Sequence, residues 1–191
     1  MDKNSYICTN TLNIIHLSQR QDRLELLKNQ LTIQEINAYK LWEGIVDQSN
    51  TAKGISKAHK QIVAWAKREN LKSVMIAEDD IKFTAKGAFN YFLKNEPTQY
   101  DLYLGGVYYG KIKEDNSVSD FAGTMLYKIH EKFYDTFLSV NEERDIDRSL
   151  ANKGKFIVCN PFVAIQHEGY SDNRKAFVNY DICLKGRKLF E

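Results

Sequence analysis

Hydrophobic positions fall into short β-type runs separated by stripes at helical spacing. The run Thr11 to Leu17 is apolar and β-branched, which predicts a buried strand. In segment 55–69, Ile55, Ala58 and His59 begin a stripe that recurs at helical spacing, which predicts the clearest helix. Strands are expected at 11–17, 36–42, 73–77, 101–104, 124–127 and 155–159. Helices are expected at 19–31, 55–69, 85–94, 131–138 and 146–152, with a hairpin or long loop over 107–121.

Strand and helix alternate through the first half, which favours an α/β fold with a mostly parallel sheet flanked by helices. The 191 residues contain no internal repeat or linker, so residues 1–191 are expected to form one domain. Residues 172–191 read as a basic, aromatic C-terminal tail that can touch a membrane surface.

The composition and net charge argue against several classes of protein. The chain is 43% hydrophobic and rich in aromatics, which argues against disorder. A net charge of +2 is too small for a dedicated nucleic-acid binder, and no apolar run approaches the roughly 20 residues of a membrane span. The N-terminus lacks a secretory-type segment, and Cys8, Cys159 and Cys183 are isolated, which is typical of a reducing, cytoplasmic location.

The most informative string is Glu78-Asp79-Asp80, which follows directly on an apolar strand. In open α/β sheets ligands bind beyond the carboxyl ends of the strands, and adjacent acids repel one another unless a cation neutralises them. Oxygen ligands suit Mg²⁺ or Mn²⁺, and along an extended backbone Glu78 and Asp80 point to one side. The alternative is a solvated turn whose acids cap the next helix.

Basic residues follow the first strand. Ser18 can cap the next helix, and Arg20 and Arg23 lie in its first turns, which makes a plausible phosphate site. The alternative is a surface helix laced by ion pairs. Two histidines leave similar choices: His59 is on an apolar stripe and could be a core residue, and His167 is in a polar loop and could be a surface residue or a metal ligand.

A second pair of acids is Asp145 and Asp147, at the start of a predicted helix. Helix capping explains one of them at most, so the other is a candidate general base for an acceptor hydroxyl. No Walker loop, nucleophile elbow or dinucleotide fingerprint is present in the sequence.

Taken in order, these segments resemble glycosyltransferase family 25, the lipopolysaccharide-type and collagen-type galactosyl- and glucosyltransferases. The resemblance covers roughly residues 11 to 172. The segments that carry it are residues 15–23, with His16 where the family has Asn; 54–59, with Ile55 and Ala58 in place of Cys and Ser; 76–80; 101–105; 123–127; and Asp147, Pro161 and 166–172.

The resemblance implies a GT-A, Rossmann-like fold and an inverting transfer of a hexose to a hydroxyl of a glycan or glycoconjugate. The expected sugar donor is a nucleotide-diphosphate sugar, with UDP as the expected nucleotide. The resemblance implies Mn²⁺ or Mg²⁺ as cofactor. It also implies residue roles: Asp147 is the expected base, with Asp145 as its substitute, and the expected metal ligands are Asp80, Glu78 and His167. The residues expected to contact the sugar-nucleotide donor are Leu17, Arg20, Arg23, His59 and Asp79. Those expected to contact the acceptor are Gly123, Thr124 and Asp172.

Two other classes of function stay open on the sequence. A metal-dependent phosphohydrolase or nucleotidyltransferase also uses paired acids beside a strand, although the further acidic pair expected on an adjacent strand is not found. A catalytically silent sugar-nucleotide or glycan-binding module would use the same residues for binding alone.

Overall fold

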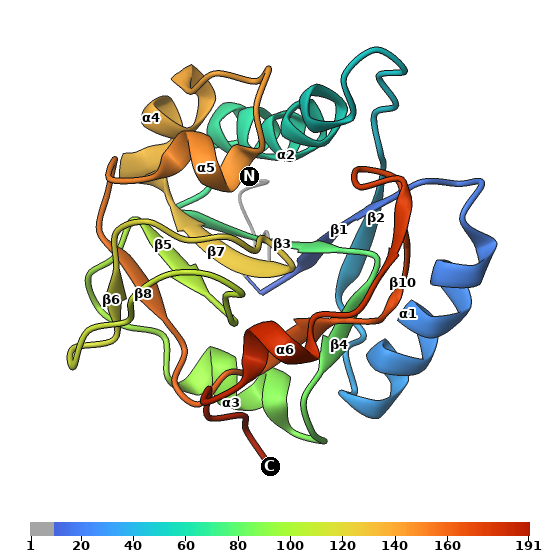
Figure 1. Ribbon diagram of the computed structural model, residues 1–191. Coiled ribbons are helices and arrows are strands. Elements are labelled where there is room, and N and C mark those ends of the chain that lie inside the picture. Colours follow the sequence, from blue (N-terminus) through green and yellow to red (C-terminus); the bar gives the residue numbers. More distant parts are fainter. Residues whose placement is uncertain (1–9) are drawn as a thin grey trace, which may run out of the picture.

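The computed structural model describes residues 10–191, so Cys8 lies outside the described residues (Figure 1). Its centre is a seven-stranded sheet in the order β2-β1-β3-β7-β5-β8-β6. The strands are β1 (Leu12–His16), β2 (Tyr39–Glu43), β3 (Ser73–Glu78), β5 (Leu102–Leu104), β6 (Ser117–Val118), β7 (Leu126–His130) and β8 (Phe156–Val158). The expected α/β class, with a mixed sheet flanked by helices, is confirmed.

The first three strands are parallel and joined by helices. β1 pairs with both β2 and β3 in parallel register, and α1 (Gln21–Ile33) and α2 (Thr51–Arg68) connect them. The side chain of Asn50 accepts a hydrogen bond from the Lys53 amide and caps α2. The predicted cap of α1 is wrong: the helix begins at Gln21, with Arg20 at the cap position and no side-chain cap bond.

The second half of the sheet is mixed. β7 runs antiparallel to both of its neighbours, β3 and β5, whereas β5 and β8 are parallel and β6 is antiparallel to β8. Five of the seven strands therefore point the same way. Because β7 is inserted antiparallel beside β3, its first residues lie at the carboxyl end of β3, next to the acids that follow that strand.

Helices cover both faces of the sheet (Figure 1). The apolar stripe of α2 packs on one face together with α4 (Tyr134–Ser139) and α5 (Ile146–Leu150). α1 and α3 (Ala88–Lys94) pack on the other face. A short 3₁₀ helix, η1 (Glu131–Phe133), precedes α4. Strand burial on both sides explains the continuous apolar runs, since a sheet covered twice exposes neither face to water.

The C-terminal third contains elements that the hydrophobic pattern missed. β4 (Ile81–Phe83) pairs antiparallel with β9 (Ala164–Gln166), and β10 (Gly169–Ser171) pairs antiparallel with β11 (Ala176–Val178). α6 (Asp181–Leu184) and the last residues follow, and Phe190 packs against Tyr91 of α3. The expected tail is therefore folded back onto the domain. These strands have three residues each, too few to give a clear period.

Within residues 10–191, no helix combines the length and apolar character needed to traverse a lipid bilayer.

Candidate active site

The three acids that follow β3 have different surroundings. Asp79 is buried, with 5% of its surface exposed. Its Oδ2 lies 2.8 Å from Nδ1 of His16, and its Oδ1 accepts a hydrogen bond of 2.8 Å from Arg23. Both oxygens are therefore occupied by β1 and α1. Asp79 thus joins the end of β3 to β1 and α1, and its contact with the sugar-nucleotide donor stays a prediction.

Glu78 and Asp80 converge on one side chain from the far end of the chain. Nε2 of Gln166 donates to Oε2 of Glu78 and to Oδ1 of Asp80, at 3.1 Å in each case. Arg23 lies 3.1 Å from the other oxygen of Asp80, and Thr124 donates to Glu78 at 2.6 Å. The expectation that Glu78 and Asp80 act together thus agrees with their geometry.

The electrostatic balance of this pair is unequal. Burial, followed by the charge of Glu78, raises the pKa of Asp80 to about 7, although Arg23 opposes the shift. Burial also opposes ionisation of Glu78, but contacts from His59 and Thr124 outweigh it and lower the pKa of Glu78. Asp80 is therefore the acid that lacks sufficient positive charge around it.

His59 is completely buried on α2 and faces the same carboxylate. Its Nδ1 lies 2.9 Å from the hydroxyl of Tyr127, and its Nε2 lies 3.6 Å from Oε1 of Glu78. Nε2 has no hydrogen-bond partner. His59 is therefore both a core histidine and a neighbour of the acid cluster. Because it is completely buried behind Glu78, it would affect the sugar-nucleotide donor through Glu78 and not by direct contact.

His167 does not join the acids through its ring. Its backbone amide donates to the carbonyl of Asp80 at 2.8 Å, which continues the β4–β9 ladder. Burial and the charge of Lys82 lower the pKa of its imidazole, and no ion pair joins that ring to a carboxylate in the described residues. The side chain that contacts the acids from this strand is therefore Gln166, and a metal-ligating role for His167 stays a prediction.

The carboxylates of Glu78 and Asp80 are the groups in this site that could bind a divalent cation. No group of three or more His, Cys, Asp or Glu residues within residues 10–191 is arranged to hold a metal. Glu78 and Asp80 are two hard oxygen ligands drawn to a single hydrogen-bond donor, and Asp80 is short of positive charge. This pair fits Mg²⁺ or Mn²⁺, which bind through one or two carboxylates and keep waters or phosphate oxygens.

Asp147 lies at the same edge of the sheet. Its carboxylate accepts hydrogen bonds from the backbone amides of Gly123, at 2.9 Å, and Arg148, at 2.6 Å. Thr124, the residue after Gly123, binds Glu78. Two consecutive residues therefore link the predicted base to the acid cluster. Burial raises the pKa of Asp147 above its ordinary value.

Asp145 takes the helix-capping position that the sequence offered to either acid. It precedes α5 but makes no side-chain cap bond, and its carboxylate accepts instead from Asn173 at 3.1 Å. Asp145 is exposed, whereas Asp147 is half-buried beside Gly123. Of the two acids, Asp147 is the one that lies near the cluster.

The predicted phosphate-binding arginines are held by the β10–β11 hairpin. Arg20 pairs with Asp172 at 2.7 Å and with Asp22 at 2.8 Å. The carbonyl of Tyr170 accepts from Arg23 at 3.2 Å. Asp172, expected at the acceptor, is thus paired on the α1 side of the site. Leu17 directly follows β1 and is half-buried.

Three residues outside the predicted site complete it. Gln166 links the two acids, His16 anchors Asp79, and the hydroxyl of Tyr108 accepts from the amide of Gln166. Tyr180 stacks on Tyr108 with ring centroids 4.1 Å apart. Gln166 and His16 lie within the segments that resemble the glycosyltransferase family, so that resemblance could have identified them as site residues. Tyr108 lies in a segment with no clear pattern.

Comparison with protein-family models finds no match, and comparison with curated protein sequences finds none. Among solved structures, HddC from Yersinia pseudotuberculosis complexed with GMP-PN overlaps 82% of this chain and 92% of that chain, at 13% identity and a TM-score of 0.45. A second HddC structure from the same organism overlaps 78% and 68%, at 12% identity and a TM-score of 0.45.

A glycosyltransferase involved in the glycosylation of the major capsid of PBCV-1 overlaps 66% of this chain and 62% of that chain, at 10% identity and a TM-score of 0.41. At this degree of overlap the likenesses identify neither a family nor an activity. The function is therefore inferred from the residues of the site.

Proposed function

We propose that the protein is a metal-dependent glycosyltransferase of the GT-A type. It would move a hexose from a nucleotide-diphosphate sugar, UDP-linked in our preferred reading, to a hydroxyl of a glycan or glycoconjugate with inversion. The observation that carries the proposal is that Glu78 and Asp80 both accept a hydrogen bond from the side chain of Gln166. Asp147 is linked to this pair through Gly123 and Thr124.

The leaving group of such a transfer is a nucleoside diphosphate, whose negative charge grows as the sugar bond breaks. Asp80 and Glu78 would hold Mn²⁺ or Mg²⁺, which neutralises that charge when bound. Arg20 and Arg23 lie on the α1 side of the same edge and can meet the remaining phosphate charge. Their present partners, Asp172 and the Tyr170 carbonyl, are on a surface hairpin that would have to yield to the donor.

The other half of the reaction is proton removal from the acceptor. The acceptor oxygen attacks the anomeric carbon, the bond from that carbon to the diphosphate oxygen breaks, and the hydroxyl proton passes to Asp147. Backbone amides hold the Asp147 carboxylate in place, and burial keeps its pKa above the ordinary aspartate value, which makes it a better proton acceptor. The acceptor would lie near Gly123 and Thr124.

The test is incubation with a panel of UDP-, GDP- and ADP-sugars in the presence of Mn²⁺, Mg²⁺ or chelator. We expect metal-dependent release of the nucleoside diphosphate, through slow hydrolysis without acceptor and faster transfer with one. Release of pyrophosphate from a nucleoside triphosphate and a sugar phosphate would instead indicate nucleotidyl transfer. Binding of a nucleotide sugar with no product would indicate a silent binding module, and both results would contradict the proposal.

A further inference from the structure

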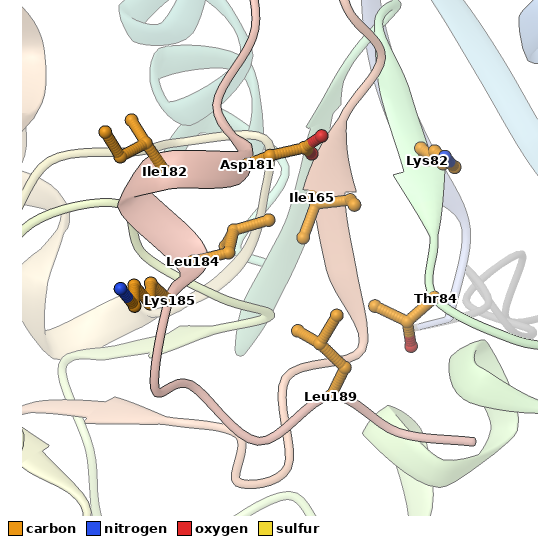
Figure 2. Close-up of a pocket in the computed structure, with 8 residues that line it drawn as sticks. All are labelled: Lys82, Thr84, Ile165, Asp181, Ile182, Leu184, Lys185 and Leu189. Carbon is orange, nitrogen blue, oxygen red and sulfur yellow. The ribbon is translucent and has the colours of Figure 1, made fainter.

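A groove of about 670 Å³ lies between the β4–β9 ribbon and the C-terminal segment (Figure 2). Its apolar lining comes from Ile165 on β9, Ile182 and Leu184 on α6, and Leu189. Lys82 on β4 and Lys185 just after α6 add two positive charges. A volume of this size is in the range of sites that hold small organic groups, roughly 300–1,000 Å³.

The groove is separate from the candidate active site. Lys82 pairs with Ile165 in the β4–β9 ladder, and both side chains face the groove. The neighbouring Gln166 points the other way and binds Glu78 and Asp80. Because side chains alternate along a strand, the ribbon presents one face to the acids and the other to the groove.

The groove includes a large apolar side chain that is open to solvent, Ile182. Ile182 is 82% exposed, more than any other large apolar side chain among the described residues. Exposed apolar groups bordered by charge are typical of a surface that binds a protein or a membrane.

The cations of this segment have no acidic partners. Among residues 10–191, the ion pairs include many lysines, but none involves Lys82, Lys175, Lys185 or Lys188. One acid, Asp181, also lines the groove and leaves it with a net positive charge. We name the set Lys82, Ile182, Leu184 and Lys185, all of which line the groove, the basic-apolar surface.

We propose that the basic-apolar surface docks on a lipid bilayer that contains anionic lipids. Ile182 would enter the interface, an apolar part of a lipid would occupy the groove, and Lys82 and Lys185 would meet the headgroup charges. Lysine suits this role because its stem can lie along apolar groups while its ammonium reaches the headgroups.

A bilayer fits this surface better than a protein partner does. A stable protein interface needs about 800 Å² of matched surface on each side. The basic-apolar surface instead offers one protruding apolar side chain, Ile182, between two lysines, which requires no shape match from a fluid bilayer. Near an anionic surface each lysine contributes roughly fivefold to binding.

Cosedimentation with vesicles tests the proposal, without donor or metal, so its outcome is independent of the proposed transferase activity. The protein is mixed with vesicles of phosphatidylcholine and phosphatidylglycerol, or of phosphatidylcholine alone. We expect binding to the anionic vesicles, about tenfold or more weaker binding to the neutral ones, and loss of most binding at high salt.

Matched variants locate the surface. Ile182→Asp is expected to weaken binding to the anionic vesicles about tenfold, and Lys185→Glu at least about fivefold. The controls are Val46→Asp, at an apolar side chain 60% exposed on the β2–α2 loop, and Lys28→Glu, at an exposed lysine on α1. Both controls should bind as the unaltered protein does.

Three results would overturn the proposal. They are no binding of the unaltered protein to anionic vesicles, equal binding to neutral ones, or equal loss in the control variants. A fourth result, vesicle binding absent and an oligomer that Ile182→Asp dissociates in size-exclusion chromatography, would assign the groove to an interface between copies of the chain.

Discussion

The acid cluster and Asp147 lie at the same edge of the sheet, but they are held in different ways. Glu78 and Asp80 are contacted by side chains from four elements or loops, including Arg23, Thr124 and Gln166. Asp147 is held by two backbone amides. A carboxylate held by side chains can exchange its partners when a ligand arrives, whereas one held by backbone amides keeps its position.

This difference distinguishes the proposed metal-binding role of Glu78 and Asp80 from the proposed role of Asp147 as the base. The cluster is electrostatically incomplete, because burial and the charge of Glu78 raise the pKa of Asp80 to about 7 even though Arg23 opposes the shift. Asp147 differs in that two backbone amides fix its carboxylate in place, although burial still raises its pKa. We therefore expect changes in the cluster to alter ligand binding and stability together, and changes at Asp147 to alter catalysis alone.

The largest effect is expected from Asp147→Asn. The amide cannot accept a proton, so transfer should fall by about 10²–10⁴-fold, while donor affinity hardly changes. Steady-state transfer and isothermal titration with donor measure the two quantities. Asp145→Asn, at an exposed acid two residues away, is the matched control. If the Asp147 variant melts at a lower temperature but retains its turnover per folded molecule, the acid is structural.

The pH dependence of transfer sharpens the same point. Burial raises the pKa of Asp147 above its ordinary value of 3.8, and a base must be ionised to act. The rate should therefore rise with pH through an apparent pKa above 3.8 and reach a plateau, and this rise should be absent in Asp147→Asn. A rise that persists in the variant would assign it to another group.

The next effect is expected from Asp80→Asn, which removes a negatively charged ligand from the cluster. Affinity for a nucleotide sugar in Mn²⁺ should fall by about 100-fold, since the metal loses one of its two carboxylates. Without metal, donor affinity should change little. Titrations with donor in Mn²⁺ and in chelator give the comparison, and an equal loss in both conditions would exclude a metal role for Asp80.

A smaller effect concerns stability in the absence of metal. Because the pKa of Asp80 is raised from 3.8 to about 7, the folded protein binds this proton more tightly than the unfolded chain does, and stability falls as pH rises between these values. Asp80→Asn should therefore raise the free energy of unfolding by about 1–3 kcal/mol above pH 7. The gain should vanish below about pH 4, where both states hold the proton.

Thermal melts of both proteins in chelator across this range provide the measurement. Glu25→Gln, at an exposed acid of α1, is the control and should shift little. A variant less stable than the unaltered protein at every pH would mean that the ion pair between Arg23 and Asp80 outweighs the repulsion in the cluster.

The smallest effect is expected from Asp172→Asn. This change removes the ion pair to Arg20, and because Asp172 is 47% exposed the loss should be under about 1 kcal/mol. Hydrogen exchange of residues 169–178 should nevertheless increase, since the pair ties the β10–β11 hairpin to α1. Unchanged exchange there would show that the Arg20 and Arg23 bonds to the Tyr170 carbonyl suffice.

The sequence by itself determined the elements with long or strong patterns. The stripe on α2 has a helical period because one face of that helix is buried, and the runs of β1 and β3 are continuously apolar because both faces of those strands are buried. It also located Glu78, Asp79 and Asp80 at a strand end, since the change from apolar to acidic residues is local. The class of fold follows from the alternation of these elements.

Tertiary structure alone decided how the acids divide their roles. Asp79 is buried by His16 and Arg23, and Glu78 and Asp80 meet Gln166, which is 86 residues from Asp80 in the chain. It also brought Gln166, and not the ring of His167, into contact with the acids. Such contacts depend on which strands become neighbours, and three-residue strands show no period from which that pairing can be read.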